Sequence, residues 1–580
     1  MKPQEISKPL VFYSLLSAAL LFAQETPPFK AVGAPSSPRV PIAWNRYYDS
    51  REIGDLCRRL AEAFPECVRF SSIGKSAQGR DLYLLTVTSF RHGDASRKPA
   101  LYIDGNIHSN EIQGSEAALY TAWFLAESFG RIDWITDLLK QKTFYIVPTI
   151  NPDARDEFMH RPNTPHSPRS GMLPRDDDGD GDLDEDPPDD LDGDGFIVMM
   201  RRRSPVGRWK ADPDDPRLMV RVADDVKGDY ELLGYEGIDN DEDGRLNEDG
   251  PGYYDPNRNW GWNWQPMFVQ EGADFYPFSI PENRAVNEFV KAHPNIAGAQ
   301  SYHNAGGMIL RGPGQADDST YLAADNRVYD ALGKLGEEIL PGYKYMVLHR
   351  DLYSVYGGEL DWFYGARGIF TFTNELWTSF DYNRRANGAK SWFGAEKEIY
   401  RFDELLLFGE GIVPWKPFDH PQFGRIEIGG IKKSWTRTAP SFMLEEMCHR
   451  NMAFTLFHAY HLPQVRIDSV AVKKISDTLW QIDVRVINDR LIPTRSAHEV
   501  KHQFTRPDWL ELKGCRVVAG YRVDNPLLDW VTEQKHRPER LCIDGVPGLG
   551  SAQVRWIVSG RPTGEIIFDS LKGGIAGRRF

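Results

Sequence analysis

The chain has 580 residues, of which 41% are hydrophobic and 12% aromatic, and this composition is typical of a globular protein and excludes a disordered one. So long a chain exceeds one ordinary hydrophobic core, so we expect two or more domains. The formal net charge is −14, but residues 176–194 hold twelve carboxylates and no Lys or Arg, so the remaining chain carries only −2. The acidity is therefore local, which favours cation binding at one place and argues against nucleic-acid binding.

The N-terminus has the pattern of a signal peptide. Lys2 and Lys8 precede an apolar run over residues 10–23, and polar residues follow. We predict a signal peptide at 1–24 and a linker at 25–43, with an uncleaved membrane anchor as the alternative. The run is short for a membrane span, and no later segment is long and apolar enough for one. We therefore expect a secreted or periplasmic protein with no stable membrane span after signal removal.

Strand and helix patterns alternate over the next hundred residues. The predicted helices are 49–64 and one that starts near residue 112, and the predicted strands are 68–73, 81–88, 100–103 and 143–150. This alternation predicts an α/β sheet. His108 and Glu111 lie where the third strand gives way to a helix, at the edge where open α/β sheets bind ligands. A His and a carboxylate at this spacing can hold one zinc ion, and a surface His beside a first-turn Glu is the alternative.

Between residues 151 and 263 the regular pattern gives way to Asp, Gly, Pro and Arg. Three loops here read Asp-x-Asp-x-Asp-Gly, in which alternate carboxylates can surround a hard cation. Their twelfth positions are Pro187, Arg201 and Gly250, so we predict compact calcium loops, not EF-hands, within an acidic insertion at 170–250. A solvated acidic loop without metal is the alternative. The candidate calcium ligands are Asp176, Asp178, Asp180, Asp190, Asp192, Asp194, Asp239, Asp241 and Asp243.

Regular structure returns after residue 280. The predicted elements are a helix at 282–292, strands at 296–302, 345–348 and 368–374, and a long helix at 441–460. Beyond Pro463 only strand patterns alternate, so residues 463–580 are predicted to form an all-β sandwich domain. Its clearest strands are 465–472, 479–486 and 553–559.

The five cysteines show no Cys-x-x-Cys spacing, so a thiolate zinc site is not expected. Cys57 and Cys67 could pair in an oxidising compartment, and buried free thiols are an equally good interpretation.

Two residues at strand ends extend the candidate zinc site. His303 follows the strand 296–302 and is the candidate third ligand, although a His there is often structural. Glu375 closes the apolar strand 368–374, where partial desolvation raises a carboxyl pKa toward that of a useful base.

Taken in order, these residues resemble a known family. His108-Ser-Asn-Glu111, then His303, then Asn374-Glu375-Leu376 is similar to the zinc metallocarboxypeptidase family of the carboxypeptidase A and B type. The resemblance covers roughly residues 44–463 and implies, for a domain at 44–462, an α/β/α sandwich around a mixed sheet. Asn110 stands where digestive members carry Arg, which is closer to the regulatory branch with its C-terminal β-sandwich.

The resemblance implies one Zn²⁺ bound by His108, Glu111 and His303, with Glu375 as general base. It further implies that Arg201 stabilises the oxyanion, with the adjacent Arg202 and Arg203 as rivals. The remaining implied residues are Asn257 and Arg258, which grip the terminal carboxylate, Tyr353, which closes over the substrate, and Leu360, which tunes the pocket for the final side chain. An apolar Leu360 indicates an apolar or aromatic final residue, whereas the adjacent Glu359 could favour a basic one.

The sequence thus predicts a zinc-dependent metallocarboxypeptidase that hydrolyses the C-terminal bond of peptides or protein C-termini. One alternative is an amidase of the same fold that acts on peptidoglycan stem peptides or acyl-amino acids. Another is a catalytically inactive, calcium-dependent binding protein.

Overall fold

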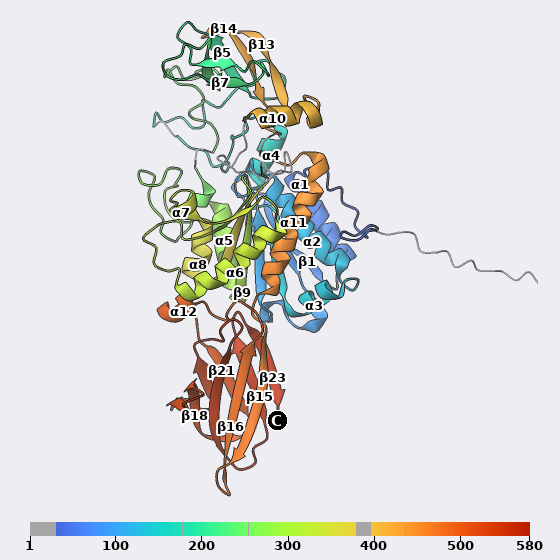
Figure 1. Ribbon diagram of the computed structural model, residues 1–580, viewed down its shortest axis with the longest axis vertical. Coiled ribbons are helices and arrows are strands. Elements are labelled where there is room, and N and C mark those ends of the chain that lie inside the picture. The colour runs from blue at the N-terminus through green and yellow to red at the C-terminus, as the bar shows by residue number, and fades with distance from the viewer. Residues whose placement is uncertain (1–30, 177–178, 253, 379–395, 436) are drawn as a thin grey trace, which may run out of the picture.

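The computed structural model describes residues 31–176, 179–252, 254–378, 396–435 and 437–580. The predicted signal peptide 1–24, the first part of the predicted linker and Asp178 lie outside the described residues. Three sheet-containing parts follow one another along the long axis of the molecule, with the α/β part in the middle and the C-terminal strands at one end (Figure 1).

An eight-stranded mixed sheet forms the middle part, in the order β1-β2-β4-β3-β9-β12-β10-β11. The strands β4, β3, β9 and β12 are parallel neighbours, whereas the β1–β2, β2–β4 and β10–β12 pairs are antiparallel. Every residue of β3 and β9 is buried, as expected of central strands covered on both faces. The strands are β1 (Val68–Lys75), β2 (Asp81–Val87), β3 (Ala100–Gly105), β4 (Thr143–Val147), β9 (Ile296–Asn304), β10 (Met308–Arg311), β11 (Lys344–Val347) and β12 (Phe370–Leu376).

Helices cover both faces of this sheet, which gives the expected α/β/α sandwich. One face packs against α1 (Ser50–Ala63), α2 (Gln113–Ser128), α3 (Asp133–Gln141), α6 (Ala323–Ile339) and α11 (Ser441–Tyr460). The other face packs against α5 (Pro281–Ala292) and α8 (Glu359–Arg367). Helix α2 is buried along its whole length because α11 covers its outer side, so it shows little amphipathic pattern. The shorter helices α4 (Pro152–His160) and α7 (Leu348–Asp351) lie in the connections.

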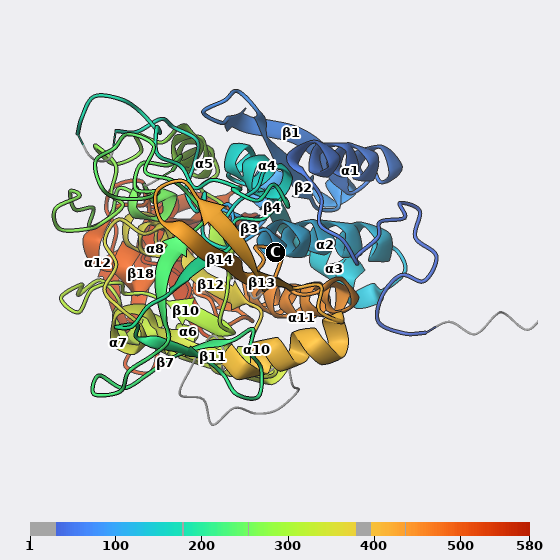
Figure 2. The same cartoon turned by 90° about the horizontal axis from the view of Figure 1, so that it is seen from above.

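The predicted loop region contributes four strands to a second sheet. Its six strands are ordered β13-β14-β5-β8-β6-β7 and lie over one end of the central sheet (Figures 1 and 2). Strand β14 pairs antiparallel with β5, which brings together two segments more than two hundred residues apart. The strands are β5 (Met199–Arg203), β6 (Trp209–Ala211), β7 (Met219–Arg221), β8 (Tyr230–Tyr235), β13 (Ile412–His420) and β14 (Gly424–Ile431). The four strands between residues 199 and 235 are short and irregularly spaced, which explains why the sequence predicts loops there.

The small core of this inserted sheet comes from both segments. Val198 and Met200 pack with Val413, Ile426 and Ile428, all of them buried. Helix α10 (Glu396–Phe402) and the π-helical turn η4 (Asp403–Leu407) lead into β13.

The C-terminal part is an all-antiparallel β-sandwich of a five-stranded and a four-stranded sheet. A separate apolar core fills the space between the two sheets. The strands are β15 (Val465–Lys474), β16 (Leu479–Asn488), β17 (Asp508–Lys513), β18 (Arg516–Asn525), β19 (Trp530–Glu533), β20 (Arg540–Ile543), β21 (Ser551–Ser559), β22 (Glu565–Ser570) and β23 (Gly574–Arg579). The one helix described here, α12 (Ala497–His502), docks on the α/β part, where His498 Nε2 lies 2.8 Å from the carbonyl oxygen of Gly365.

All five cysteines are free thiols, so the structure does not contain the Cys57–Cys67 disulfide that was considered. Among the described residues, no helix combines the length and the hydropathy that crossing a membrane requires.

Candidate metal centre

Two histidines and a glutamate meet at the carboxyl ends of β3 and β9. Because β3, β9 and β12 are parallel neighbours, their carboxyl ends share one edge of the sheet. Nδ1 of His108 lies 3.1 Å from Oε2 of Glu111, and Nδ1 of His303 lies 3.0 Å from the same oxygen. The two Nδ1 atoms are 3.2 Å apart. All three side chains are buried, so the group has the donors and the low solvent access of a metal site.

This triangle of ligand atoms fits a zinc ion. Zinc bonds of about 2.0–2.1 Å place neighbouring ligand atoms roughly 3.3 Å apart in a tetrahedral arrangement. The two imidazole nitrogens and the carboxylate oxygen all carry lone pairs that point toward one another. One cation between them can accept all three lone pairs, whereas protons would leave some of these lone pairs facing each other without a partner. Three protein ligands also leave a fourth position open, as in catalytic zinc sites.

The chain around His108 fixes its position. Asn106, directly after β3, has a left-handed φ of 60°. Its Nδ2 donates to the carbonyl oxygen of His108 at 2.6 Å. On the other side of the ring, Nε2 of His108 lies 2.9 Å from Oδ1 of Asp255, the kind of contact that orients a metal-binding imidazole. Burial alone would raise the pKa of Asp255, but Arg258 and His108 hold it well below its usual value, so the carboxylate stays ionised.

Glu375 completes the edge from the neighbouring strand. It lies near the end of β12, opposite His303 in the β9–β12 register, and lines one narrow pocket with His108 and His303. Burial and the nearby Glu111 raise the pKa of Glu375 to about 7. A carboxyl group with this pKa can accept and return a proton near neutral pH.

Comparison with known proteins agrees with this arrangement. Residues 53–157 and 234–391 match a family model described as zinc carboxypeptidase. The part of the chain that holds these residues belongs to the zinc carboxypeptidase family. Residues 464–580, which form the β-sandwich, match a model described as a domain of unknown function.

Curated relatives match short stretches. The inactive metallocarboxypeptidase ECM14 of Ajellomyces capsulatus is 38% identical over 126 residues, which are 22% of this chain and 21% of that protein. Carboxypeptidase D of Homo sapiens is 31% identical over 100 residues, 17% of this chain and 7% of that protein. The chain thus spans about a fifth or less of the length of these relatives.

Solved structures match more of the length at lower identity. Thrombin activatable fibrinolysis inhibitor is 18% identical with a TM-score of 0.44, covering 74% of this chain and 80% of that chain. Carboxypeptidase A from Helicoverpa armigera is 18% identical with a TM-score of 0.43, covering 73% of this chain and 76% of that chain.

The arginine beside the candidate metal ligands is Arg169, and the structure corrects the expectation for Arg201. Nη1 of Arg169 donates to Oε1 of Glu111 at 2.7 Å, and Arg169 lines the pocket that holds Glu375. Arg201 lies instead on β5 of the inserted sheet, where Nε lies 2.7 Å from Oε2 of Glu427. Arg169 belongs to an irregular stretch without periodicity, so no sequence pattern points to it.

The other predicted substrate-binding residues of this family member line the same pocket. Asn257, Arg258, Tyr353 and Leu360 are all among its lining residues. The backbone N–H of Asn257 donates to Oδ1 of Asp255 at 2.7 Å, so one carboxylate holds both the ligand His108 and the Asn-Arg pair. Tyr353 is 56% exposed on the loop before α8, at the mouth of the pocket.

The inner wall of this pocket is mainly apolar. Leu310, Leu348 and Val355 line it together with Leu360. Glu359, which could favour a basic substrate residue, does not line it. Its side chain is buried and accepts a hydrogen bond from Ser301 Oγ at 3.0 Å, behind the pocket wall.

One further carboxyl group, that of Asp361, lines the pocket and is hydrogen-bonded to neighbouring protein groups. Asp361 accepts hydrogen bonds from the Gly314 N–H at 2.8 Å and the Tyr321 hydroxyl at 3.2 Å. Burial raises the pKa of Asp361 to about 7, which weakens its charge. The wall therefore favours an apolar side chain.

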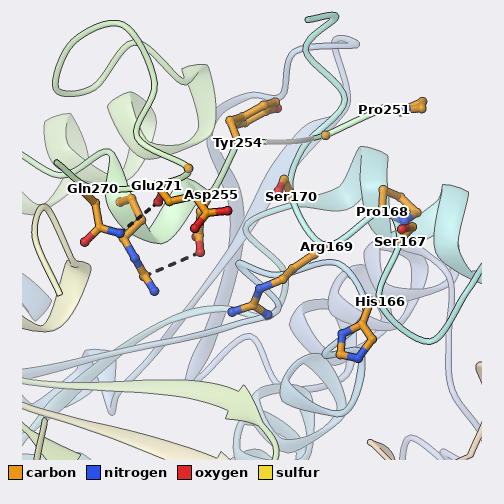
Figure 3. Close-up of a pocket in the computed structure, with 13 residues that line it drawn as sticks. His166, Ser167, Pro168, Arg169, Ser170, Pro251, Tyr254, Asp255, Gln270 and Glu271 are labelled. Carbon is orange, nitrogen blue, oxygen red and sulfur yellow. Dashed lines mark hydrogen bonds and ion pairs between the residues drawn. The ribbon is translucent and has the colours of Figure 1, made fainter. Parts of the chain in front are cut away.

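A second hollow of about 380 Å³ opens beside the metal ligands and shares Arg169 and Arg258 with the first pocket. Figure 3 shows Gln270, Glu271 and Asp255 on one side of it, with Arg169 between them and His166. The segment that carries Arg169 and His166 is fixed to the metal loop, because the backbone N–H of Ser109 donates to the Arg169 carbonyl oxygen at 2.9 Å.

The acidic loops bring carboxylates together away from this centre. Ligand atoms lie within 4.8 Å of one another in three groups: Asp190, Asp192 and Asp194; Asp239, Asp241 and Asp243; and Asp180, Glu185 and Asp241. In the first loop Asp176 accepts hydrogen bonds from the backbone of Gly179 and Gly181, whereas Asp178 is not described.

Proposed function

We propose that the protein is an active zinc-dependent metallocarboxypeptidase that removes the C-terminal residue of peptides. The observation that carries the proposal is the convergence of the His108–Glu111–His303 triangle with Glu375 in a pocket that Arg258 also lines. Together these residues offer a metal site, a proton acceptor and a cation for a terminal carboxylate.

A zinc ion held by the three ligands would lower the pKa of a bound water and polarise the scissile carbonyl. Glu375 would accept a proton from the attacking water and return it to the leaving amine, which its pKa of about 7 permits. Arg169 would donate to the carbonyl oxygen as it gains charge, since its guanidinium is already held beside the metal ligands by Glu111.

Asn257 and Arg258 support exopeptidase geometry. A guanidinium fork matches the two oxygens of a free carboxylate, so Arg258 would position the chain end and leave only the last bond in reach. Tyr353, exposed at the mouth of the pocket, would cover the bound residue. Leu360 and its apolar neighbours favour an apolar or aromatic final side chain.

The test is a panel of peptides that differ only in the last residue, with and without a zinc chelator. We expect turnover of peptides that end in Phe or Leu, its loss in chelator and its return with added zinc. Glu375→Gln should keep the metal content and lose turnover. Chelator-resistant cleavage, or a metal-loaded enzyme that cleaves nothing in the panel, would overturn the proposal.

Two other functions give different results in the same assay. An inactive, calcium-dependent binding protein, in line with the relative named inactive, would bind peptides and release no amino acid. An amidase of the same fold would cleave peptidoglycan stem peptides or acyl-amino acids in preference to ordinary peptides. The intact set of metal ligands with Glu375 favours the peptidase.

We also propose that the acidic loops bind calcium. Burial and the adjacent Asp186 raise the pKa of Glu248 to about 7, which indicates carboxylates packed together without enough cations. Calcium should raise the melting temperature and Asp241→Asn should remove that effect, because Asp241 belongs to two of the carboxylate groups. An unchanged melting temperature with calcium would leave the loops as solvated segments.

We propose, finally, that the enzyme acts outside the cytoplasm, as a secreted or periplasmic protein. The signal-peptide pattern of residues 1–24 supports this. N-terminal sequencing of the mature protein should begin near residue 25, and a retained Met1 would contradict it.

A further inference from the structure

The inserted sheet encloses a hollow of about 280 Å³ that the carboxypeptidase chemistry does not use. Its wall is aromatic and aliphatic, and it is built by both inserted segments together with α10. The main wall residues are Met199, Trp209, Tyr235, Tyr400, Trp415 and Ile431.

The Trp415 ring of this wall is held in place from outside the hollow. The Arg201 guanidinium lies between the rings of Tyr230 and Trp415, 4.3 Å and 4.1 Å from their centroids. Nε1 of Trp415 donates to the carbonyl oxygen of Arg217 at 2.9 Å. Arg217 in turn contacts Oδ2 of Asp403 at 3.0 Å, which ties the wall to η4. A wall fixed in this way is preformed for a ligand.

The hollow adjoins the catalytic centre. Pro165 and His166 line it, and His166 also lines the second hollow together with Arg169, which reaches the pocket of His108 and His303 as well. Nδ2 of Asn110, within the metal loop, donates to the Pro165 carbonyl oxygen at 3.1 Å. Arg437 bridges the same place, since its guanidinium lies 3.2 Å from Nδ1 of His166 and 3.9 Å from Glu111.

The direction of a bound peptide follows from these contacts. Arg258 and Asn257, which would hold the terminal carboxylate, lie on the His108–Asp255 side of the metal ligands. The upstream chain must leave on another side. Arg437 and His166 lie on the Glu111–His303 side, because Nη1 of Arg437 donates to the carbonyl oxygen of Asn304, next to His303, at 3.0 Å.

We propose that the hollow in the inserted sheet is a subsite for an apolar or aromatic side chain of the substrate, a few residues upstream of the scissile bond. The proposal rests on the carboxypeptidase activity proposed above. The enzyme would then select peptides by an internal residue, which the inserted sheet binds, as well as by the final residue.

The size and polarity of the hollow favour a side chain over other ligands. At about 280 Å³ the hollow has room for one large side chain and lies at the lower end of the range of about 300–1,000 Å³ for small-molecule pockets. Aromatic rings and Met side chains make favourable contacts with aromatic and aliphatic groups. Saccharides also stack on Trp and Tyr rings, so the experiment includes a saccharide as a competitor.

The experiment moves one Phe through a series of acetylated hexapeptides that otherwise contain Gly and end in Phe. One upstream position should raise kcat/KM by roughly 10- to 100-fold over the all-Gly peptide. Trp209→Ala should remove this gain and leave turnover of a short acyl-dipeptide at the parent rate. Trp209→Phe, which keeps a ring, should retain part of the gain. Val220→Ala is the matched control, because Val220 lies on β7 and is 42% exposed outside the hollow.

Equal kcat/KM at every position, or a gain that survives Trp209→Ala, would overturn the subsite. So would competition by chitooligosaccharides with an apolar peptide. Failure of the proposed activity looks different, because then the acyl-dipeptide too is not cleaved. In that case binding of the same hexapeptides to Glu375→Gln, followed by fluorescence anisotropy, still decides the subsite through its dependence on the Phe position.

Discussion

At the scale of single residues, two arginines in one chain have opposite roles. Arg169 contacts the ligand Glu111, whereas Arg201 is enclosed by aromatic rings of the inserted sheet. We predict that Arg169→Ala lowers kcat by about 10²–10³-fold, the usual loss for one oxyanion donor. Arg201→Ala should leave turnover of an acyl-dipeptide unchanged. Steady-state kinetics of the two metal-loaded variants checks this, and equal losses in both would contradict the assignment.

The proton acceptor gives a prediction in pH. Burial and Glu111 raise the pKa of Glu375 to about 7, so the basic form is lost as the pH falls through this value. We expect an acid limb in the pH profile, in which kcat/KM falls about tenfold per pH unit below this pKa. The positive charge of a bound metal moves the limb to lower pH without changing its direction. A pH profile measures it, and a rate that rises toward acid pH would exclude Glu375 as the base.

At the scale of elements, the inserted sheet depends on pairing between distant segments. Ile428 on β14 is 1% exposed and packs with Met200 on β5. We predict that Ile428→Ala destabilises this sheet by about 2–5 kcal/mol, the range for buried Ile to Ala. Hydrogen exchange should then rise in both 199–203 and 424–431, because the two strands are paired. Val220→Ala, at an exposed position of β7, should change neither, and a rise in only one segment would argue against a cooperative sheet.

The acidic insertion and the hairpin 412–431 lie far apart in sequence but belong to the same sheet. The sequence presents an acidic insertion, and the structure makes this insertion and the hairpin of β13 and β14 parts of one sheet over the metal centre. That sheet carries the hollow for which we propose an upstream side chain.

At the scale of the whole molecule, a buried lysine joins the β-sandwich to the α/β part. Nζ of Lys572 pairs with Glu499 at 2.8 Å and donates to the carbonyl oxygens of Arg367 and Gly368, at the end of α8. Lys572 is 6% exposed and Glu499 is 1% exposed.

We predict that Lys572→Met lowers the free energy of unfolding by about 3–5 kcal/mol, because it leaves the Glu499 charge buried without its partner. Adding Glu499→Gln should recover part of the loss. Urea unfolding followed by Trp fluorescence measures both variants. A double variant as unstable as the single one would show that the lost contacts to Arg367 and Gly368 matter more than the ion pair.

The sequence by itself determines much of the α/β core and the metal ligands. The sequence predicts the helix 441–460 and the strand ends that carry His303 and Glu375 where the structure has them. Both predictions rest on local features, namely the periodicity of apolar residues and the polar residues that end an apolar strand. The triangle formed by His108, Glu111 and His303 likewise follows from strand ends that meet at one edge of a parallel sheet.

Only the tertiary structure decides which arginine lies at the metal and what the insertion becomes. No sequence pattern distinguishes Arg169 from Arg201. Their contacts in the structure do, because Arg169 contacts Glu111 whereas Arg201 contacts the Tyr230 and Trp415 rings. The pairing of β5 with β14 joins residues more than two hundred positions apart, so neither segment by itself indicates its partner. The physical reason is that hydrogen bonding and packing between distant segments depend on their spatial neighbours, which no local pattern records.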